Sequence, residues 1–110
     1  MVIMRILVMF DLPTGTQQEK KEYAKFRKFL LKDGFLMEQF SVYSRMTIDR
    51  DNLNTHIKRI EANLPPAGSV QVLQVTEYQF ERRQILVSPL KPTNTKKEID
   101  KQPSQLTLFF

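Results

Sequence analysis

The sequence predicts an α+β fold in one domain, because short apolar segments of strand composition alternate with two amphipathic segments of helical periodicity. A chain of 110 residues is long enough to bury one hydrophobic core. Its 41% hydrophobic and 26% charged residues are ordinary for a soluble globular domain. We therefore expect strands and helices that pack into a single unit.

The first predicted element is an apolar strand that ends at a carboxylate. Residues 3–11 read Ile-Met-Arg-Ile-Leu-Val-Met-Phe-Asp, and Pro13 closes the run. Strand side chains alternate between two faces. One face carries Ile3, Arg5, Leu7, Met9 and Asp11, and the other carries Met4, Ile6, Val8 and Phe10. Asp11 has two interpretations, a ligand for metal or phosphate chemistry or a turn residue that caps the loop before Pro13.

A first helix is predicted to follow a capping box and to run to about Asp33. Thr16 and Glu19 have the spacing of the capping box, and Gly34 stands where a left-handed residue ends a helix. The side chains predicted to be buried are Tyr23, Phe26, Phe29 and Leu30. Spacings of four, three and four place Lys21, Lys25, Lys28 and Lys32 on one exposed stripe, flanked by Lys20 and Arg27.

The middle of the chain predicts two short strands and a second helix. The strands lie within residues 35–48 and join near Phe40 and Ser41. Asp49 or Asp51 caps the helix, and residues 65–68 (Pro-Pro-Ala-Gly) end it. The apolar residues of this helix are Leu53, Ile57, Ile60 and Leu64, spaced four, three and four apart. His56 lies beside this stripe but off it, so we expect a surface or partly packed histidine and no general base.

The last third of the chain predicts further strands and a linker. Residues 70–76 form one strand, residues 77–80 a turn-like link in which Glu77, like Glu81, is a solvated charge, and residues 83–87 another strand. Domain boundaries are predicted at 1–87 for the folded domain and at 88–110 for the remainder. The remainder is a Pro- and Lys-rich linker that ends in an apolar strand at 106–110.

The element order is strand-helix-strand-strand-helix-strand with extra C-terminal strands, which is the ferredoxin-like arrangement. Its antiparallel sheet carries both helices on one face, so the face with Ile3, Leu7 and Met9 would contact water in a monomer. Such an apolar patch usually marks an association surface. We therefore expect a homodimer packed sheet to sheet about a two-fold axis. The candidate interface residues are Leu7, Met9, Leu106, Leu108 and Phe109, the last three because the tail could pair with the partner's sheet edge.

Composition narrows the partners and the compartment. The excess of 17 Lys and Arg over 12 Asp and Glu gives a net charge of +5, and the pI is about 9.6, which points to a polyanionic partner if the charge is clustered. The absence of cysteine excludes disulfides, thiolate nucleophiles and cysteine-ligated metals, and agrees with a cytoplasmic location. No stretch approaches the roughly 18 apolar residues of a membrane span, and the first strand has no signal-peptide cleavage site.

Four motifs in order carry a resemblance to a known family. They are Met-Phe-Asp-Leu-Pro at 9–13, Lys-Phe-Arg-Lys-Phe-Leu-Leu-Lys-Asp-Gly-Phe at 25–35, Gln-Phe-Ser-Val-Tyr-Ser-Arg at 39–45 and Gln-Val-Leu-Gln-Val-Thr-Glu-Tyr-Gln-Phe-Glu-Arg at 71–82. The chain resembles the small ferredoxin-like CRISPR-associated protein that partners the spacer integrase. It looks most like members from systems with a single large RNA-guided nuclease, and the resemblance covers roughly residues 1–87.

The resemblance implies a function in spacer acquisition for antiviral defence. It implies a homodimer in which the acids of the first strand approach each other across the interface, held between integrase dimers that insert short duplex DNA into a repeat array. It also implies a magnesium site at Asp11, since relatives are often catalogued as magnesium-dependent endonucleases acting on RNA or DNA. Ser41 to Tyr43 match the family's Ser-Val-aromatic segment, and the basic first helix matches in character.

Two function hypotheses follow. In the first, the dimer is a non-catalytic scaffold that binds double-stranded DNA through the phosphates, without reading sequence. The cations assigned to this contact are Lys21, Lys25, Arg27, Lys28 and Lys32, although such a stripe can also be only a solvated face. In the second, Asp11 serves a Mg²⁺-dependent phosphodiesterase. A two-metal nuclease normally uses several acids, and no second or third carboxylate is evident, so the sequence favours the scaffold. A small-molecule sensor is disfavoured by the positive charge and the lack of a Gly-rich pocket loop.

Overall fold

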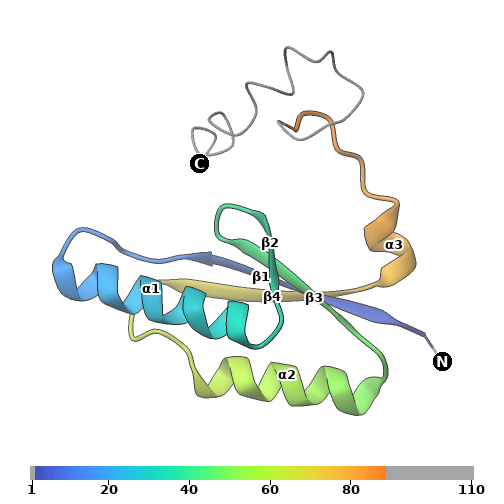
Figure 1. Ribbon diagram of the computed structural model, residues 1–110, viewed down its shortest axis with the longest axis horizontal. Helices are drawn as coiled ribbons and strands as arrows, with labels where there is room; N and C mark the ends of the chain where they lie inside the picture. The colour runs from blue at the N-terminus through green and yellow to red at the C-terminus, as the bar shows by residue number, and fades with distance from the viewer. Residues whose placement is uncertain (1, 89–110) are drawn as a thin grey trace.

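The computed structural model describes residues 2–88, which form a four-stranded sheet with two long helices on one face (Figure 1). The elements are β1 (Met4–Asp11), α1 (Gln17–Lys32), β2 (Leu36–Gln39), β3 (Val42–Thr47), α2 (Arg50–Ala62), β4 (Ser69–Thr76) and α3 (Glu77–Glu81). The strand order is β2-β3-β1-β4, and every pair of neighbours is antiparallel. This is the ferredoxin-like arrangement, as the element order predicts.

Local capping fixes where the two long helices begin. The Thr16 side chain accepts a hydrogen bond from the Glu19 backbone N–H at 3.1 Å, and the Glu19 carboxylate accepts from the Thr16 N–H at 3.0 Å. At the start of α2, the Asp49 side chain accepts from the Asn52 N–H at 2.7 Å. These hydrogen bonds confirm both expected caps. Each cap satisfies N–H groups that have no partner within the helix. Gly34 has a φ of +91°, the left-handed conformation expected just after α1.

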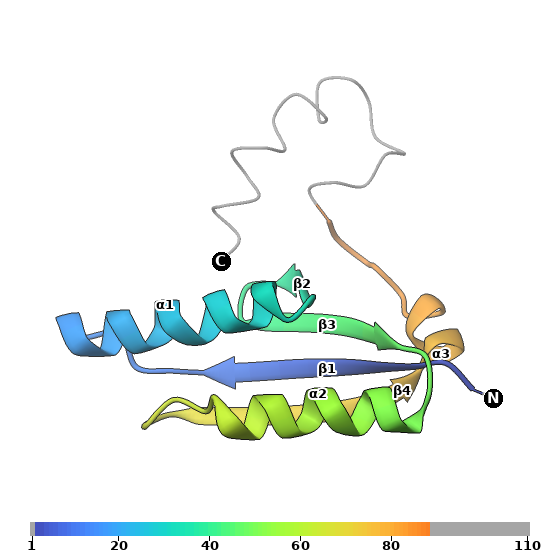
Figure 2. The same ribbon diagram turned by 60° about the horizontal axis from the view of Figure 1, so that its bottom comes forward.

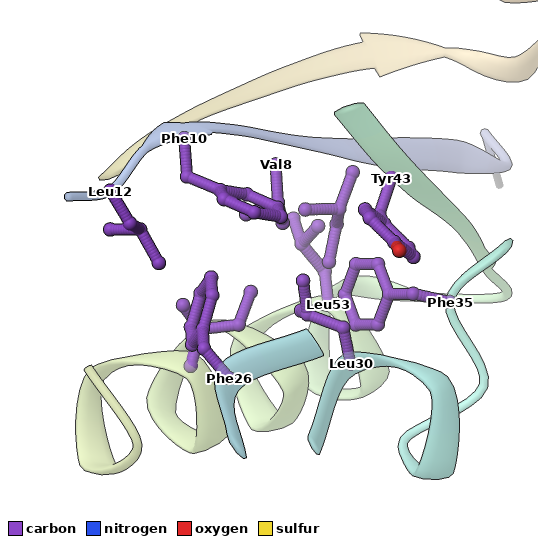
Figure 3. Packing of buried hydrophobic residues seen from close by; sticks show 10 residues of the cluster. Val8, Phe10, Leu12, Phe26, Leu30, Phe35, Tyr43 and Leu53 are labelled. Atoms are coloured by element: carbon purple, nitrogen blue, oxygen red, sulfur yellow. The ribbon is translucent and has the colours of Figure 1, made fainter. Parts of the chain in front are cut away.

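The core lies between the sheet and the two helices (Figure 3). Ile6, Val8 and Phe10 of β1 point toward the helices and are 0–7% exposed. The Phe10 ring meets the Phe26 ring of α1 edge to face at 5.2 Å and stacks on the Tyr43 ring of β3 at 5.7 Å. Aromatic pairs at such spacing add to the stabilisation from burial. The predicted alternation of β1 and the buried stripe of α1 are confirmed.

The other face of the sheet has no helix along most of its length, and we call it the open face (Figure 1). Its register brings one residue from each strand into a row: Leu36 pairs with Ser44, Ser44 with Leu7, and Leu7 with Leu73. The apolar side chains on the open face are Leu7, Met9, Leu36, Val42, Met46, Leu73 and Val75. The sheet is therefore apolar on both sides but packed by long helices on one.

Two predictions for the end of the domain are wrong. Residues 77–81 form the short helix α3 in place of a turn, and residues 83–87 form no strand. The cause is a second capping box, in which the Thr76 side chain accepts from the Gln79 N–H and the Gln79 side chain accepts from the Thr76 N–H, both at 3.0 Å. This cap turns the chain out of the sheet, so Ile85, Leu86 and Val87 are exposed and have no strand partner within residues 2–88.

Other expectations are answered in part. Leu64 lies beyond the end of α2 and is 52% exposed, so it is not a core residue. The predicted strand at 106–110, with Leu106, Leu108 and Phe109, lies outside the described residues, as does most of the predicted linker. Within residues 2–88, no helix is both long and apolar enough to cross a membrane.

Candidate functional site

Asp11 is the last residue of β1, and its side chain is exposed on the same face as Leu7 and Met9. β4 fixes its position, because Asp11 pairs with Ser69. The loop between α2 and β4 packs tightly against this end of β1. A Cβ on Gly68 would lie 2.7 Å from the Asp11 carbonyl oxygen, and Gly68 has a φ of +97°. No hydrogen bond or ion pair joins the Asp11 carboxylate to another residue in the range 2–88. The carboxylate is therefore available to an external ligand.

A hairpin turn lies beside this end of β1. The Phe10 N–H donates to the Ser41 carbonyl at 3.0 Å, and Ser41 has a φ of +65°, which is uncommon for a residue with a side chain. The hydroxyls of Ser41 and Tyr23 lie 3.2 Å apart. Tyr43, two residues on, is 1% exposed, and burial raises the pKa of its phenol against the opposing effect of the Arg27 guanidinium. The segment from Ser41 to Tyr43 thus positions the turn and the core and presents no buried ligand set to Asp11.

The described residues do not complete a metal site within one chain. No group of three His, Cys, Asp or Glu side chains among residues 2–88 could hold a metal ion. Mg²⁺ in proteins is held by one or two carboxylates and retains several waters. The exposed Asp11 has the donor chemistry that Mg²⁺ requires, and a second carboxylate would have to come from another copy of the chain. Fit to magnesium therefore depends on the dimer.

A cluster at the other end of the open face was missed by reasoning from the sequence. The Arg5 guanidinium donates to both carboxylate oxygens of Glu77, at 2.7 and 2.8 Å, and to the Ser44 hydroxyl at 2.9 Å. The Phe80 ring lies between two guanidinium groups, 4.2 Å from Arg5 and 3.8 Å from Arg83. We call Arg5, Ser44, Glu77, Phe80 and Arg83 the Arg5 cluster. It attaches α3 to the end of the sheet where β1 begins (Figure 1).

The electrostatics of the Arg5 cluster correct the expectation that Glu77 is a solvated charge. The Glu77 side chain is only 17% exposed, and its hydrogen bonds with Arg5 lower the pKa of its carboxyl. The same contact raises the pKa of Arg5. An arginine on an otherwise apolar strand face requires a carboxylate partner, which is the one signal that could have found this contact. Arg5 is thus neutralised within the chain.

The predicted cation stripe is present on α1, with one exception. Lys21, Lys25, Lys28 and Lys32 are all exposed, and we call these four residues the lysine stripe. They lie on the helix surface away from Phe26 and Leu30, because an α-helix turns about 100° per residue. Arg27 is about 100° from Lys28 by the same geometry, which places it on another flank of the helix. The structure therefore separates Arg27 from the lysines.

The structure contradicts the expectation that His56 is a surface or partly packed residue. It is 4% exposed, and its Nδ1 lies 2.7 Å from the Asp33 carboxylate, which also accepts from Arg59 at 2.8 Å. The sequence pattern placed His56 beside the apolar stripe, but the histidine is buried where it contacts the Asp33 side chain, which is 8% exposed at the end of α1. These contacts join α1 to α2 and leave His56 inaccessible to a substrate. The histidine is structural, and it is no general base.

The model of the family described as CRISPR associated protein Cas2 matches residues 4–83. A CRISPR-associated endoribonuclease Cas2 of Parvibaculum lavamentivorans is 44% identical over 106 residues, which cover 96% of this chain and 100% of that protein. The protein of the same name from Flavobacterium psychrophilum is 46% identical over 104 residues, which cover 94% of this chain and 86% of the relative.

Solved structures agree in fold. A chain described as "Crystal structure of cas2" superposes with a TM-score of 0.56 at 15% identity, covering 86% of this chain and 95% of that one. This likeness supports the ferredoxin-like topology alone, since the sequences have diverged. The match over residues 4–83 and the relatives aligned along nearly the whole chain confirm the resemblance that the four motifs indicated. The chain belongs to the Cas2 family of CRISPR-associated proteins.

Proposed function

We propose that this chain is a homodimeric scaffold for spacer acquisition, which binds double-stranded DNA and bridges integrase subunits. The observation that carries the proposal is the open face, a broad apolar surface on a basic protein. Leu36, Met46 and Leu73 on this face are 66%, 47% and 50% exposed in the single chain. Contiguous apolar patches of this kind mark association surfaces. A second copy applied sheet to sheet would cover them with an identical surface.

Dimerisation through the open face leaves the lysine stripe free. The stripe lies on the side of α1 away from the buried Phe26 and Leu30, so an interface on the open face does not bury it. Each dimer would carry two such stripes on its outer surfaces. Exposed lysines contact phosphates without reading bases, which suits a protein that handles DNA of any sequence. About six phosphate contacts per dimer would give a log–log salt dependence of about −5.

The bridging function rests on family membership. Relatives in the Cas2 family are the basis for expecting an integrase subunit as partner, and the exposed Ile85, Leu86 and Val87 add apolar surface that an assembled state would cover. These three residues have strand composition and follow α3, which lies beside the open face. Their pairing with an edge of the partner's sheet would remove them from water.

A second candidate function is a Mg²⁺-dependent endonuclease acting on RNA or DNA. Two observations favour it: the free, exposed carboxylate of Asp11, and the name endoribonuclease carried by the similar proteins. In a sheet-to-sheet dimer, Asp11 of each copy would hold the ion, whose chemistry would be to polarise a phosphate or its bound water. Within residues 2–88, no group of three metal-ligating side chains includes Asp11, which is why the scaffold is preferred.

One assay separates the two functions. Wild type and Asp11→Ala are incubated with labelled duplex DNA and single-stranded RNA, with and without Mg²⁺. We expect salt-sensitive duplex binding that Asp11→Ala retains, with no cleavage. Mg²⁺-dependent cleavage that disappears in Asp11→Ala, with binding retained, would establish the nuclease and overturn the scaffold as the sole function.

Matched lysine variants test the DNA contact itself. The double change Lys25→Gln/Lys28→Gln removes two cations from the lysine stripe of each copy, and we expect the salt slope to fall from about −5 to about −2. Lys58→Gln on α2 is the control, because Lys58 is also exposed but lies on the other helix. A loss of binding free energy half as large in the control as in the stripe variant, in proportion to one charge removed against two, would mean that only net charge matters.

A further inference from the structure

A small apolar hollow lies at the end of the sheet where β1 ends. It has a volume of about 80 Å³, several times the roughly 10–15 Å³ needed for one water. Leu12, Pro13, Tyr23, Pro65 and Pro66 form its apolar wall, and we call it the proline hollow. The β1–α1 loop and the α2–β4 loop both lie at this end of the molecule (Figure 2). The hollow is too small for a typical ligand pocket of about 300–1,000 Å³, but it has room for one side chain.

The wall of the hollow is fixed before any partner arrives. The two consecutive prolines restrict the backbone of the α2–β4 loop, and Gly68 brings that loop against the residue pair Asp11 and Leu12. On the opposite side, the Tyr23 ring stacks on the Phe40 ring at 6.0 Å, and its hydroxyl lies 3.2 Å from that of Ser41. A preorganised pocket loses little conformational entropy on binding. The hollow is therefore suited to receiving an apolar anchor.

The rim of the hollow is acidic, although the protein is basic overall. Glu19 and Glu22 from the first turns of α1 line it. Glu19 accepts hydrogen bonds from the N–H groups of Gly15 and Thr16, and Glu22 accepts one from the Gln18 amide at 2.9 Å. No cation within residues 2–88 forms an ion pair with either carboxylate. Two negative charges beside an apolar cavity repel phosphates and attract lysine or arginine.

We infer that the proline hollow anchors a partner protein through one aliphatic or aromatic side chain flanked by Lys or Arg. The apolar wall holds the anchor, and Glu19 and Glu22 select the flanking cations. The lysine stripe begins on the adjacent surface of α1, at Lys21 and Lys25, so a partner seated here would lie beside any nucleic acid bound to the stripe. The wall and the rim of the hollow are the same whether or not this chain is a DNA scaffold.

The probe is the capped peptide acetyl-Gly-Lys-Leu-Lys-Gly-amide, titrated into the full ¹⁵N-labelled chain and followed by amide shifts. We expect saturable shifts at Leu12, Tyr23 and Ala67, with a dissociation constant of about 1 mM, the weak affinity of one anchored side chain. A peptide with Gly in place of Leu controls for charge, and one with Glu in place of both Lys controls for the apolar anchor. Neither should bind.

Two variants test the two halves of the site. Glu19→Gln/Glu22→Gln keeps the capping box, because Gln also serves at that position, and should weaken binding roughly fivefold. Ala67→Phe fills the hollow from an exposed position and should abolish binding, with an unchanged melting temperature showing that the fold is intact. Absence of saturable shifts, or equal binding of the Gly or Glu control peptide, would overturn the inference. So would displacement of signals from residues 89–110, which would identify the chain's own tail as the occupant.

Discussion

Neighbouring residues of β1, Phe10 and Met9, point to opposite faces of the same sheet and meet different surroundings. Phe10 is 7% exposed among the rings of Tyr23, Phe26 and Tyr43, contributed by two other elements. Met9 is only half-buried and lies in a row with Val42 of β3 and Gln71 of β4. The backbone pairing is the same on both faces, so the difference comes from the side chains that pack against each face: rings of α1 and β3 surround Phe10, and no long helix covers Met9.

The open face is itself divided. Where β1 begins, the Arg5 cluster and α3 cover the sheet, and Phe80 is 8% exposed beneath Arg83. Where β1 ends, none of the described helices covers the open face, and Asp11 is exposed. The chain thus closes one end of the face with an ion pair and leaves the other end apolar with an acid at its edge. The difference indicates which part of the surface awaits a partner.

The largest expected effect is on the helix side. Phe10→Ala removes a ring from the centre of the core and should lower the free energy of unfolding by about 3–5 kcal/mol. Met9→Ala, one residue away, should lower it by about 1 kcal/mol, because Met9 is only half-buried by its own chain. Urea denaturation followed by circular dichroism measures both. Equal losses would show that the two faces are packed alike and would remove the basis of the comparison.

The next effect is at the covered end of the open face. Glu77→Gln removes the bidentate partner of Arg5 and should cost about 1–3 kcal/mol at neutral pH. Because folding lowers the pKa of Glu77 below its ordinary value of 4.5, its contribution is complete above that value and is lost as pH falls through the lower folded pKa. The difference between wild type and Glu77→Gln should therefore shrink below about pH 4.5.

Glu81→Gln is the matched control for this prediction. Glu81 is on the same short helix but is exposed, so the change should stay within about 0.5 kcal/mol. Thermal or urea unfolding from pH 3 to pH 7 gives both profiles. A difference between wild type and Glu77→Gln that does not depend on pH would mean that the ion pair is not what holds α3 against the sheet.

The sequence predicts the helix side of this molecule well and the open face less well. Alternation along β1 and the periodicity of α1 are local patterns, and each follows from which side chains need burial. The Arg5–Glu77 pair joins residues 72 positions apart, so no local pattern contains it. The contact between His56 and Asp33 could not be predicted for the same reason, since it depends on how α1 and α2 are placed relative to each other.

The prediction of a strand at 83–87 is wrong for a different reason. Its residues have strand composition, but a strand also requires a neighbour to pair with, and the cap at Thr76 directs the chain away from the sheet. Composition predicts what a segment can form and not whether a partner strand lies beside it. Asp11 shows the same limit at the candidate site. Its exposure at the end of β1 follows from the alternation of side chains along the strand, but no sequence pattern predicts a second metal ligand beside it.

The smallest effect on the fold, with the largest consequence for assembly, is expected at Leu73. This residue is 50% exposed on the open face, so Leu73→Glu should change the unfolding free energy of the isolated chain by about 0.5 kcal/mol or less. In a sheet-to-sheet dimer the same change would bury an unpaired carboxylate, and the dimer dissociation constant should rise at least about tenfold. Leu31→Glu is the matched control, because Leu31 is 42% exposed on α1. Sedimentation equilibrium of wild type and the two variants measures the dimer dissociation constants. A monomeric wild type, or equal dissociation caused by Leu31→Glu, would show that the open face is not where two copies meet.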